Sequence, residues 1–336
     1  MNRRTFNKLS LAAALTLAPR LSLAQQVSHD VVGFQSAEMN DGVLTATPQG
    51  FARRDIAVSN DTLFQVASCS KTATSLAVLT LVRDGHIDLD MPVNRYLSRW
   101  QLPGPRSATV TIAELMSHSA GTTVHGFGGY GPTDDIPDLL EILDGRGAAN
   151  SGAIRTRHRL FCQFRYSGGG TTVLQTMIED VTGEDFAAYV TRAVLRPIGA
   201  SRATFAITPP SEFAHGSFEN GQPVSGGFMR HPESAAAGLW ATASDLVRLF
   251  QAILDSVNGA QHAILPQTLA QRMITPVKQQ AGLGVFASPG RTLWHEGRNF
   301  GFDSIVMAEL TTGRIRAAVT NRNGAIERYA QSLLAL

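Results

Sequence analysis

A serine and a lysine lie three residues apart in a chain that has few lysines. Lys71 and Lys278 are the only lysines after the first 24 residues, and the first of them ends the run Ser68-Cys69-Ser70-Lys71. On a helix, Ser68 and Lys71 would share one face, one turn apart. A lysine that is partly removed from water can lose its proton near neutral pH and can then activate the hydroxyl. In the alternative interpretation, Ser68 caps the helix and Lys71 is a solvated residue of the first turn.

Metal and phosphate chemistry have little support in this sequence. The nine histidines include no His-Glu-x-x-His run and no close pairing with cysteine or carboxylate at ligand spacing. The three glycines at 168–170 lack the Gly-Lys-Ser/Thr ending of a phosphate-binding loop. We therefore expect no cofactor. Cys69 and Cys162 either form a disulfide or are small buried residues, and the sequence leaves both options open.

Several histidines and aromatic residues have a plain structural interpretation. His118 and His125 flank the start of a Gly-rich loop over residues 121–131, where we expect them to form loop hydrogen bonds. Trp240, Trp294 and the phenylalanines are expected in the core rather than on a binding surface.

The Ser68–Lys71 pair must be positioned by a helix. Apolar side chains recur at helical spacing after this pair, which predicts a helix from about residue 68 to residue 84. Helical spacing and capping residues predict further helices in the middle of the chain, the first and last of them behind a threonine cap. They cover residues 111–116, 171–182, 186–194 and 242–254.

Both ends of the chain have the pattern of β-strands. Residues 31–65 consist of short apolar runs that are separated by turn signals at 40–42, 48–50 and 59–61. Near the other end, two β-rich runs are joined by Thr311-Thr312-Gly313, which is a hairpin signal. These runs cover residues 304–310 and 314–321, and a last helix is expected over about 325–334.

This order of elements predicts an α+β fold. One antiparallel sheet would contain strands from both chain ends and would be flanked by helices. The sequence has no internal repeat and no low-complexity linker. We therefore expect residues 25–336 to form one domain, with a helical subdomain over roughly residues 90–240.

Composition and charge exclude several classes of protein. The 336 residues are 43% hydrophobic and 17% charged, which is not the composition of a disordered chain. No apolar run approaches the roughly 20 residues of a membrane-spanning helix. The formal charge is +2, but the first 24 residues carry four basic and no acidic residues, so the rest of the chain is mildly acidic. We therefore expect no nucleic-acid partner and no stable membrane span.

The first 24 residues have the layout of a secretory signal peptide. A charged start at residues 2–8 precedes a largely apolar stretch, and Ser22 and Ala24 are small residues of the kind that a signal peptidase reads. The pair Arg3-Arg4, followed by Phe6 and Lys8, resembles the twin-arginine export motif. We expect a signal peptide over residues 1–24 and a periplasmic protein.

Two further stretches follow the Ser68–Lys71 run in a fixed order. They are Phe164-Arg165-Tyr166-Ser167-Gly168 and Trp294-His295-Glu296-Gly297. With the first run, they resemble the three motif boxes of serine hydrolases in the β-lactamase and penicillin-binding protein superfamily, in its class C-like branch. Residues 115–122 and 237–242 also resemble landmarks of this family. The resemblance covers the chain from about residue 30 onward and implies a β-lactamase/transpeptidase-like fold.

The resemblance implies roles for the residues of these boxes. Ser68 would be the nucleophile that becomes acylated, and Lys71 and Tyr166 would share the transfer of its proton. Tyr166 would act as a phenolate, or as a relay whose pKa is lowered by Lys71. The backbone N–H groups of Ser68 and Arg298 would form an oxyanion hole. Gly297 would let substrate lie against its strand.

Two positions depart from the family pattern. Gly168 stands where many relatives have asparagine, which removes a donor to the substrate. His295 stands where β-lactamases have lysine, and its ordinary pKa of about 6.5 would leave it mostly neutral at pH 7.5.

These departures point away from β-lactams as the preferred substrate. We expect an exported hydrolase that forms an acyl-enzyme with a small-molecule or peptide-like ester or amide, as a carboxylesterase or D-Ala-type peptidase. It would turn over β-lactams weakly. The alternatives are a β-lactamase, or a penicillin-binding or sensor protein that is acylated without turnover.

Overall fold

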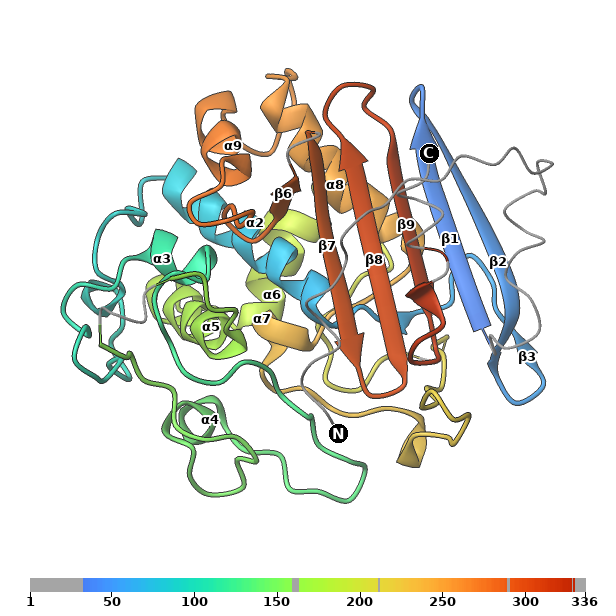
Figure 1. Cartoon of the computed structure of the whole chain (residues 1–336), viewed down its shortest axis with the longest axis horizontal. Coiled ribbons are helices and arrows are strands. Elements are labelled where there is room, and N and C mark those ends of the chain that lie inside the picture. The colour runs from blue at the N-terminus through green and yellow to red at the C-terminus, as the bar shows by residue number, and fades with distance from the viewer. Residues whose placement is uncertain (1–32, 159–162, 211, 289–290, 328, 330–336) are drawn as a thin grey trace, which may run out of the picture.

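A computed structural model describes residues 33–158, 163–210, 212–288, 291–327 and 329 of the chain (Figure 1). The expected signal peptide, Cys162 and most of the expected last helix lie outside these residues. No helix within the described ranges is long and apolar enough to cross a membrane.

An antiparallel sheet of seven strands contains both ends of the described chain (Figure 1). Its order is β3-β2-β1-β9-β8-β7-β6. The strands are β1 (Gly33–Asn40), β2 (Val43–Arg53), β3 (Ile56–Ala57), β6 (Phe286–Ser288), β7 (Thr292–Asn299), β8 (Phe302–Glu309) and β9 (Ile315–Thr320). β1 pairs with β9, with Phe34 opposite Thr320, so the first and last strands meet in the middle of the sheet. The expected α+β fold is confirmed.

The prediction of a turn at residues 48–50 is wrong. β2 continues through Pro48, which lies opposite Gln35 of β1. β3 pairs with β2 only from Phe51 onward, so the outer edge of β2 is unpaired at Pro48. A proline is tolerated there because its missing N–H can face an unpaired edge.

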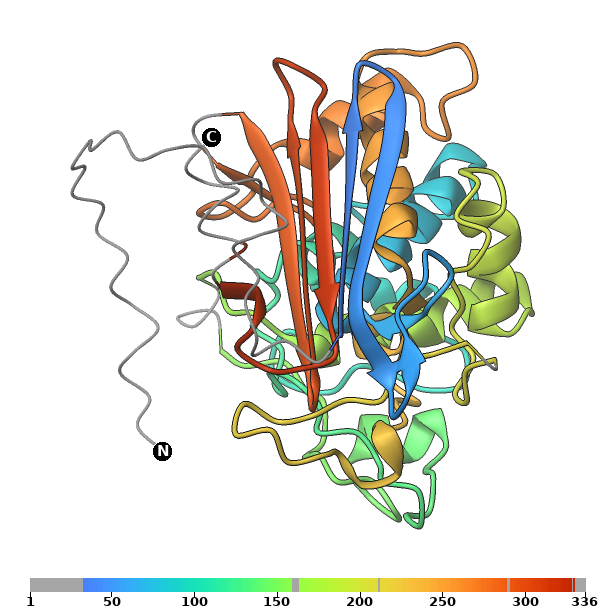
Figure 2. The same cartoon turned by 90° about the vertical axis from the view of Figure 1, so that its right-hand side faces the viewer.

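Helices cover one face of the sheet (Figure 2). They are α2 (Ser70–Arg83), α3 (Ile112–Met116), α4 (Leu139–Asp144), α5 (Gly168–Thr182), α6 (Phe186–Val190), α7 (Ser234–Ala237), α8 (Ala243–Val257) and α9 (Gln267–Ile274). α8 packs against β1 and β9 and begins behind Thr242, whose side chain accepts the N–H of Asp245 in a capping box. A separate two-stranded sheet joins β4 (Phe64–Gln65) to β5 (Trp240–Ala241).

α2 is the central helix of the molecule and contacts α5, α6 and α7. Its residues from Ser70 to Leu81 are buried on every side, as is expected of a helix without a polar face. The helix begins two residues later than predicted, because a 3₁₀ turn over Ala67–Cys69 precedes it. α5 begins three residues earlier than predicted, since the Ser167 side chain caps it by accepting the N–H of Gly170.

Candidate active site

Ser68 lies in a strained turn between β4 and α2. Ala67, directly before it, has a positive φ of 47°, a conformation that is costly for a residue with a side chain. The Ser70 hydroxyl stabilises this conformation by donating to the Ala67 carbonyl at 2.5 Å and accepting the Leu239 N–H at 2.9 Å. Ala67 and Cys69 are buried, whereas Ser68 is partly exposed. The turn therefore presents the Ser68 hydroxyl to the outside of a rigid core.

Lys71 lies directly beneath this hydroxyl. Its Nζ is 3.0 Å from Ser68 Oγ and donates to the Ala236 carbonyl at 2.7 Å. The side chain is only 3% exposed, and no carboxylate of the described residues forms an ion pair with it. Burial without a counter-charge lowers the pKa of Lys71 to about 7. A large fraction of the amine is therefore neutral at neutral pH and able to accept a proton.

Tyr166 contacts the same two residues. Its hydroxyl is hydrogen bonded to Ser68, and Lys71 Nζ lies 4.9 Å from the centre of its ring. Burial raises the pKa of Tyr166 above its ordinary value, and the hydrogen bond to Ser68 only partly opposes this shift. The expectation that Lys71 lowers this pKa is therefore wrong. The free protein holds Tyr166 as a neutral phenol, which leaves the relay and not the phenolate.

His118 holds the segment that carries Tyr166. Its carbonyl accepts the N–H of Arg165 at 2.8 Å, and its Nδ1 accepts the N–H of Ser167 at 3.3 Å. Its ring lies 4.3 Å from the Tyr166 ring, between centroids. Burial keeps the pKa of His118 well below its ordinary value, so Nδ1 stays available as an acceptor. His118 therefore bonds to Arg165 and Ser167 beside Tyr166, and not within the Gly-rich loop as the sequence predicts.

His295 is buried in the wall of the site. It is 1% exposed, and its Nδ1 is 2.7 Å from the Glu296 carbonyl. A carbonyl only accepts hydrogen bonds, so Nδ1 carries the hydrogen and Nε2 has a free lone pair, for which the described residues offer no partner. Burial, helped by the charge of Lys71, lowers the pKa of His295 to about 3. The position where β-lactamases have a lysine is therefore uncharged at neutral pH.

Gly297 is needed for packing between β7 and the Ser68 turn. A Cβ at this position would lie 2.2 Å from the Val66 carbonyl oxygen and 2.9 Å from the Ser68 nitrogen. A side chain at this position would therefore meet the chain itself. That substrate lies against this strand stays a prediction. Arg298 follows on β7, and its side chain is held by Asp303 on β8 at 2.8 Å. The expected role of the Arg298 backbone N–H in an oxyanion hole stays a prediction.

Gly168 is the first residue of α5 and is buried against the Gly-rich loop. Its N–H donates to the His125 carbonyl at 2.9 Å. A Cβ there would lie 3.0 Å from the Phe127 ring and 3.2 Å from the His125 carbonyl oxygen. Many relatives have asparagine at this position. Here the Gly-rich loop packs against Gly168 and leaves no open space for a longer side chain.

Cys69 has a free thiol in the core. Its Sγ is 3.3 Å from Ser304 Oγ, and burial raises the pKa of the thiol to about 12. This neutral, buried thiol is not a second nucleophile beside Ser68.

α7 is the part of the site that sequence reasoning missed. Three consecutive carbonyls of this short helix accept hydrogen bonds from different elements: Ala235 from Thr74 on α2, Ala236 from Lys71, and Ala237 from Asn299 at the end of β7. Backbone carbonyls that accept hydrogen bonds cannot be recognised from a sequence, because every residue has one. The only available signal was the resemblance of residues 237–242 to a family landmark.

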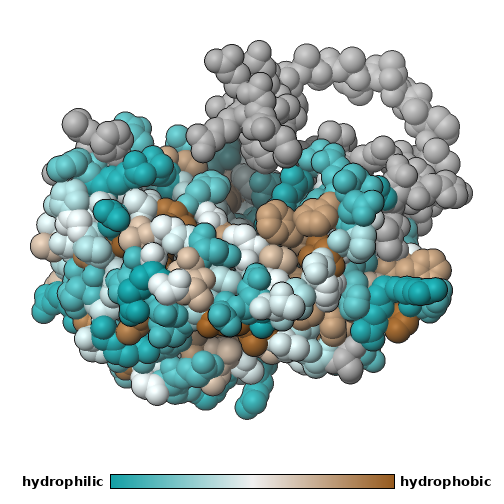
Figure 3. Space-filling view, turned by 90° about the horizontal axis from the view of Figure 1, so that it is seen from below, coloured by the Kyte–Doolittle hydropathy of each residue, from teal (hydrophilic) through white to brown (hydrophobic). Residues whose placement is uncertain are grey.

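Two exposed phenylalanines lie close to the C-terminal end of β7. Phe218 and Phe300 are 36% and 48% exposed, and their ring centroids are 5.8 Å apart. The Phe300 ring also lies beside Gly128 of the Gly-rich loop. Figure 3 looks at this end and shows a group of hydrophobic residues beside the grey atoms.

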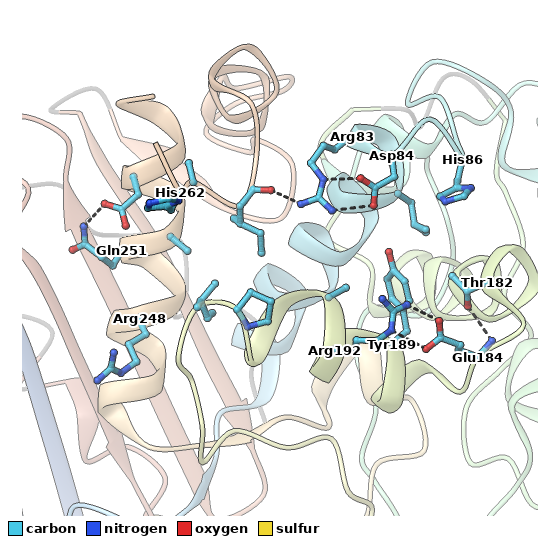
Figure 4. Close-up of a pocket in the computed structure, with 18 of the residues that line it drawn as sticks. Arg83, Asp84, His86, Thr182, Glu184, Tyr189, Arg192, Arg248, Gln251 and His262 are labelled. Atoms are coloured by element: carbon cyan, nitrogen blue, oxygen red, sulfur yellow. Dashed lines mark hydrogen bonds and ion pairs between the residues drawn. The ribbon is translucent and has the colours of Figure 1, made fainter. Parts of the chain in front are cut away.

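A cavity of about 790 Å³ lies away from Ser68 (Figure 4). It is lined by residues from the C-terminal ends of α2 and α5, from the region of α6 and from α8. Two of its arginines are paired: Arg83 with Asp84 at 2.7 Å, and Arg192 with Glu184 at 2.5 Å. Arg248 also lines the cavity. None of the residues of the three motifs lines it.

Comparison with known proteins identifies the family. The family model described as Beta-lactamase matches residues 22–335. Esterase EstB of Burkholderia gladioli is 29% identical over 276 residues, which cover 72% of this chain and 68% of that protein. PbpX of Bacillus subtilis (strain 168) is 24% identical over 269 residues, which cover 77% of this chain and 63% of that protein. The chain thus spans about two thirds of the length of these relatives.

Solved structures show the same fold. D-amino acid amidase from Ochrobactrum anthropi SV3, in complex with L-phenylalanine amide, superposes with a TM-score of 0.74 at 21% identity over 93% of this chain and 96% of that one. The octameric penicillin-binding protein homologue from Pyrococcus abyssi gives a TM-score of 0.72 at 22% identity, over 91% and 74% of the two chains. Together with the family match over nearly the whole chain, these findings place the chain in the β-lactamase family of serine hydrolases.

Proposed function

We propose that this protein is an exported serine hydrolase that forms an acyl-enzyme on Ser68 and cleaves uncharged esters and small amides faster than β-lactams. One observation carries the proposal: Lys71 Nζ lies 3.0 Å from Ser68 Oγ, in a buried setting that makes it a base near neutral pH. The relative named as an esterase and the fold neighbour named as a D-amino acid amidase support this substrate class.

Acylation begins when the neutral amine of Lys71 accepts the Ser68 proton and Ser68 Oγ bonds to the substrate's carbonyl carbon. The backbone N–H groups of Ser68 and Arg298 stabilise the negative charge on the carbonyl oxygen. The bond to the leaving oxygen or nitrogen then breaks, and that atom takes the proton of the Tyr166 hydroxyl. Tyr166 then regains a proton from the Lys71 ammonium, which restores the neutral amine. In the second half of the cycle, water bonds to the acyl carbon and gives a proton to Lys71. The bond to Ser68 Oγ breaks, Oγ takes that proton, and the carboxylic acid leaves.

The electrostatics of the site favour uncharged substrates. His295 and His118 are both neutral at pH 7.5, because burial lowers their pKa values. The carboxylate of a β-lactam therefore meets no fixed cation at the position of His295. The binding of an uncharged ester does not depend on such a cation. Phe127 packs against Gly168, where many relatives have the asparagine.

A turnover panel on the purified mature protein tests the proposal. We expect kcat/KM for p-nitrophenyl butyrate to exceed the value for nitrocefin at pH 7.5, with a D-Ala-D-Ala peptide as the amide substrate. A fluorophosphonate probe should add one adduct by intact mass, and Ser68→Ala should add none. A larger nitrocefin value would identify a β-lactamase. A single equivalent of acylation without turnover would identify a penicillin-binding or sensor protein.

Export is the second part of the proposal and rests on residues 1–24 alone. Protein recovered from the periplasm should begin at Gln25, as read by N-terminal sequencing. Replacement of Arg3 and Arg4 by lysine should reduce export by the twin-arginine route. Undiminished export of that variant would point to the general secretory pathway.

A further inference from the structure

Aromatic side chains from three separate segments meet beside Ser68. Phe164 lies two residues before Tyr166, Phe286 lies on β6, and Trp294 lies on β7. The Phe286 ring is 6.1 Å from Phe164, 4.7 Å from Trp294 and 6.5 Å from Tyr166, between centroids. Tyr166 is itself hydrogen bonded to Ser68, so the cluster adjoins the tyrosine that contacts the reacting hydroxyl. We refer to Phe164, Phe286 and Trp294 as the aromatic cluster.

The aromatic cluster remains partly exposed although its rings are large and apolar. All three side chains keep intermediate exposure, unlike the fully buried rings of the core such as Phe64 and Phe250. Exposed apolar surface that is grouped at one place and adjoins reactive groups marks a binding surface. The expectation that Trp294 belongs to the core is wrong for this reason.

Strand pairing fixes the cluster in place. Phe286 lies directly opposite Trp294 in the pairing of β6 with β7, and their rings are stacked at 23°. The only polar group of the Trp294 ring donates to Ser288 Oγ at 3.1 Å, so it does not compete for a polar ligand. A rigid, preformed surface loses little conformational entropy when it binds a ligand.

The surroundings of the cluster favour an uncharged ligand. Phe286 faces the neutral rings of His295, at 5.4 Å, and His118, at 6.5 Å. The exposed Arg165 lies between Phe164 and Tyr166 in the sequence. Covering these rings with apolar surface gains free energy, whereas a charged group would lose its hydration against them.

We infer that the aromatic cluster is the subsite for the leaving group, and that it takes an apolar, uncharged alcohol or amine such as a benzyl group. The assignment to the leaving side rests on the proposed function, in which Tyr166 protonates the leaving atom. Within the cluster, Phe286 stacks on Tyr166 and contacts both Phe164 and Trp294, so the group attached to the leaving atom lies against the Phe286 side of the cluster.

Four esters separate the two sides of the substrate. Methyl acetate and benzyl acetate share the acyl group and give the same acetyl-enzyme, and their alcohols are similar in acidity. Methyl phenylacetate places the aromatic ring on the acyl side instead, and methyl hydrogen succinate adds a negative charge. We expect kcat/KM of the wild-type protein to be roughly 10- to 100-fold higher for benzyl acetate than for methyl acetate. The charged ester should be the slowest.

Phe286→Ala should remove most of the preference for benzyl acetate, so the ratio of kcat/KM for benzyl acetate to that for methyl acetate should fall close to one. Phe286→Leu should retain part of it, because leucine keeps apolar volume at the site. Phe51→Ala is the matched control: Phe51 is 54% exposed but lies on β2, four strands away from β7. Benzyl alcohol should inhibit the wild-type protein competitively and inhibit Phe286→Ala at least tenfold more weakly, a readout that does not depend on turnover of the benzyl ester.

Three results would overturn the inference. They are equal kcat/KM values for methyl and benzyl acetate in the wild type, an unchanged preference in Phe286→Ala, or a loss confined to methyl phenylacetate. In each case Ser68 would still hydrolyse methyl acetate, so the proposed function would stand. Failure of the proposed function looks different, because the wild type would then hydrolyse none of the four esters.

Discussion

The cavity of Figure 4 and the site around Ser68 both contain basic side chains, but the two regions place them in opposite surroundings. In the cavity, Arg83 is paired with Asp84, and this contact raises the pKa of the arginine and lowers that of the aspartate. At Ser68, Lys71 is buried without an acidic partner, and its pKa falls to about 7. A paired arginine stays protonated, whereas a lysine that is buried without a counter-charge becomes a base. The burial of an unpaired lysine, more than the volume of the cavity, therefore distinguishes the candidate active site.

The largest effect should follow removal of the unpaired base. Lys71→Met should lower kcat/KM for p-nitrophenyl butyrate by roughly 10³–10⁴, near the upper end of what a positioned acid–base group contributes. Lys278→Met, at the exposed second lysine of the body, and Arg83→Met, in the cavity, should stay within about twofold of the wild type. If Arg83→Met lowers kcat/KM as much as Lys71→Met does, the two regions do not differ in function as we propose.

The second-largest effect should follow a change in the packing between β7 and the Ser68 turn. The methyl group of Gly297→Ala would lie 2.2 Å from the Val66 carbonyl oxygen, so β7 or the Ser68 turn must shift. We expect kcat to fall by about 10²-fold, the cost of a misplacement of roughly 1 Å. Gly126→Ala, in the Gly-rich loop, meets no atom within 4 Å and is the matched control. If stopped-flow acylation of Gly297→Ala proceeds at the wild-type rate, the close contact is not functional.

The pH dependence of the rate tests the base directly. Lys71 must be neutral to accept the Ser68 proton, so kcat/KM should rise with pH through a midpoint near 7 and level off above it. Below that midpoint, the rate should fall about tenfold per pH unit. A profile that is flat from pH 5 to 9 would remove Lys71 as the base.

A smaller effect should come from His118, which acts through Tyr166. His118→Phe keeps a ring against Tyr166 but loses the acceptor for the Ser167 N–H, whereas His118→Asn keeps an acceptor and loses the ring. Asparagine also tolerates the positive φ of 56° at this position. Each variant should lower kcat roughly tenfold, less than the loss of an acid–base group itself.

A double-mutant cycle shows whether His118 positions Tyr166 or only stabilises the fold. In the Tyr166→Phe background, the kcat effect of either His118 variant should shrink to less than about twofold, because the group being positioned is gone. Additive losses would mean that His118 acts on the structure as a whole. The melting temperature of each variant separates the two explanations further.

The smallest effect concerns stability and has a definite sign. The folded pKa of Lys71 is below its ordinary value, so the unfolded chain binds the proton more tightly between about pH 7 and pH 10. The free energy of unfolding of the wild type should therefore rise with pH across this window. Lys71→Met lacks this contribution, and its gain in melting temperature over the wild type should be largest at pH 6 and smaller at pH 9. A gain that grows with pH would contradict the burial of an uncompensated amine.

Spacing and motif order were enough to predict the α+β fold and the residues that meet at Ser68. The i, i+3 spacing of Ser68 and Lys71 is local, and a hydroxyl and an amine so close in sequence can contact each other in almost any helical turn. The Ala236 carbonyl could not be predicted, because it comes from an element 165 residues away and involves no side chain. The rise in the pKa of Tyr166 was also missed, since burial depends on the three-dimensional packing.

The pairing of β1 with β9 has a consequence for how the protein is made. Phe34 and Thr320 are opposite each other in the middle of the sheet, so one edge of β1 has no partner until β9 has left the ribosome. β7, against which the Ser68 turn packs, also comes late in synthesis. Joining segments so far apart is slow, because a long loop must close before the contacts form. We therefore expect no hydrolase activity before β7 is made. A nascent chain halted before residue 292 would carry Ser68 and Lys71 without β7, against which the Ser68 turn packs.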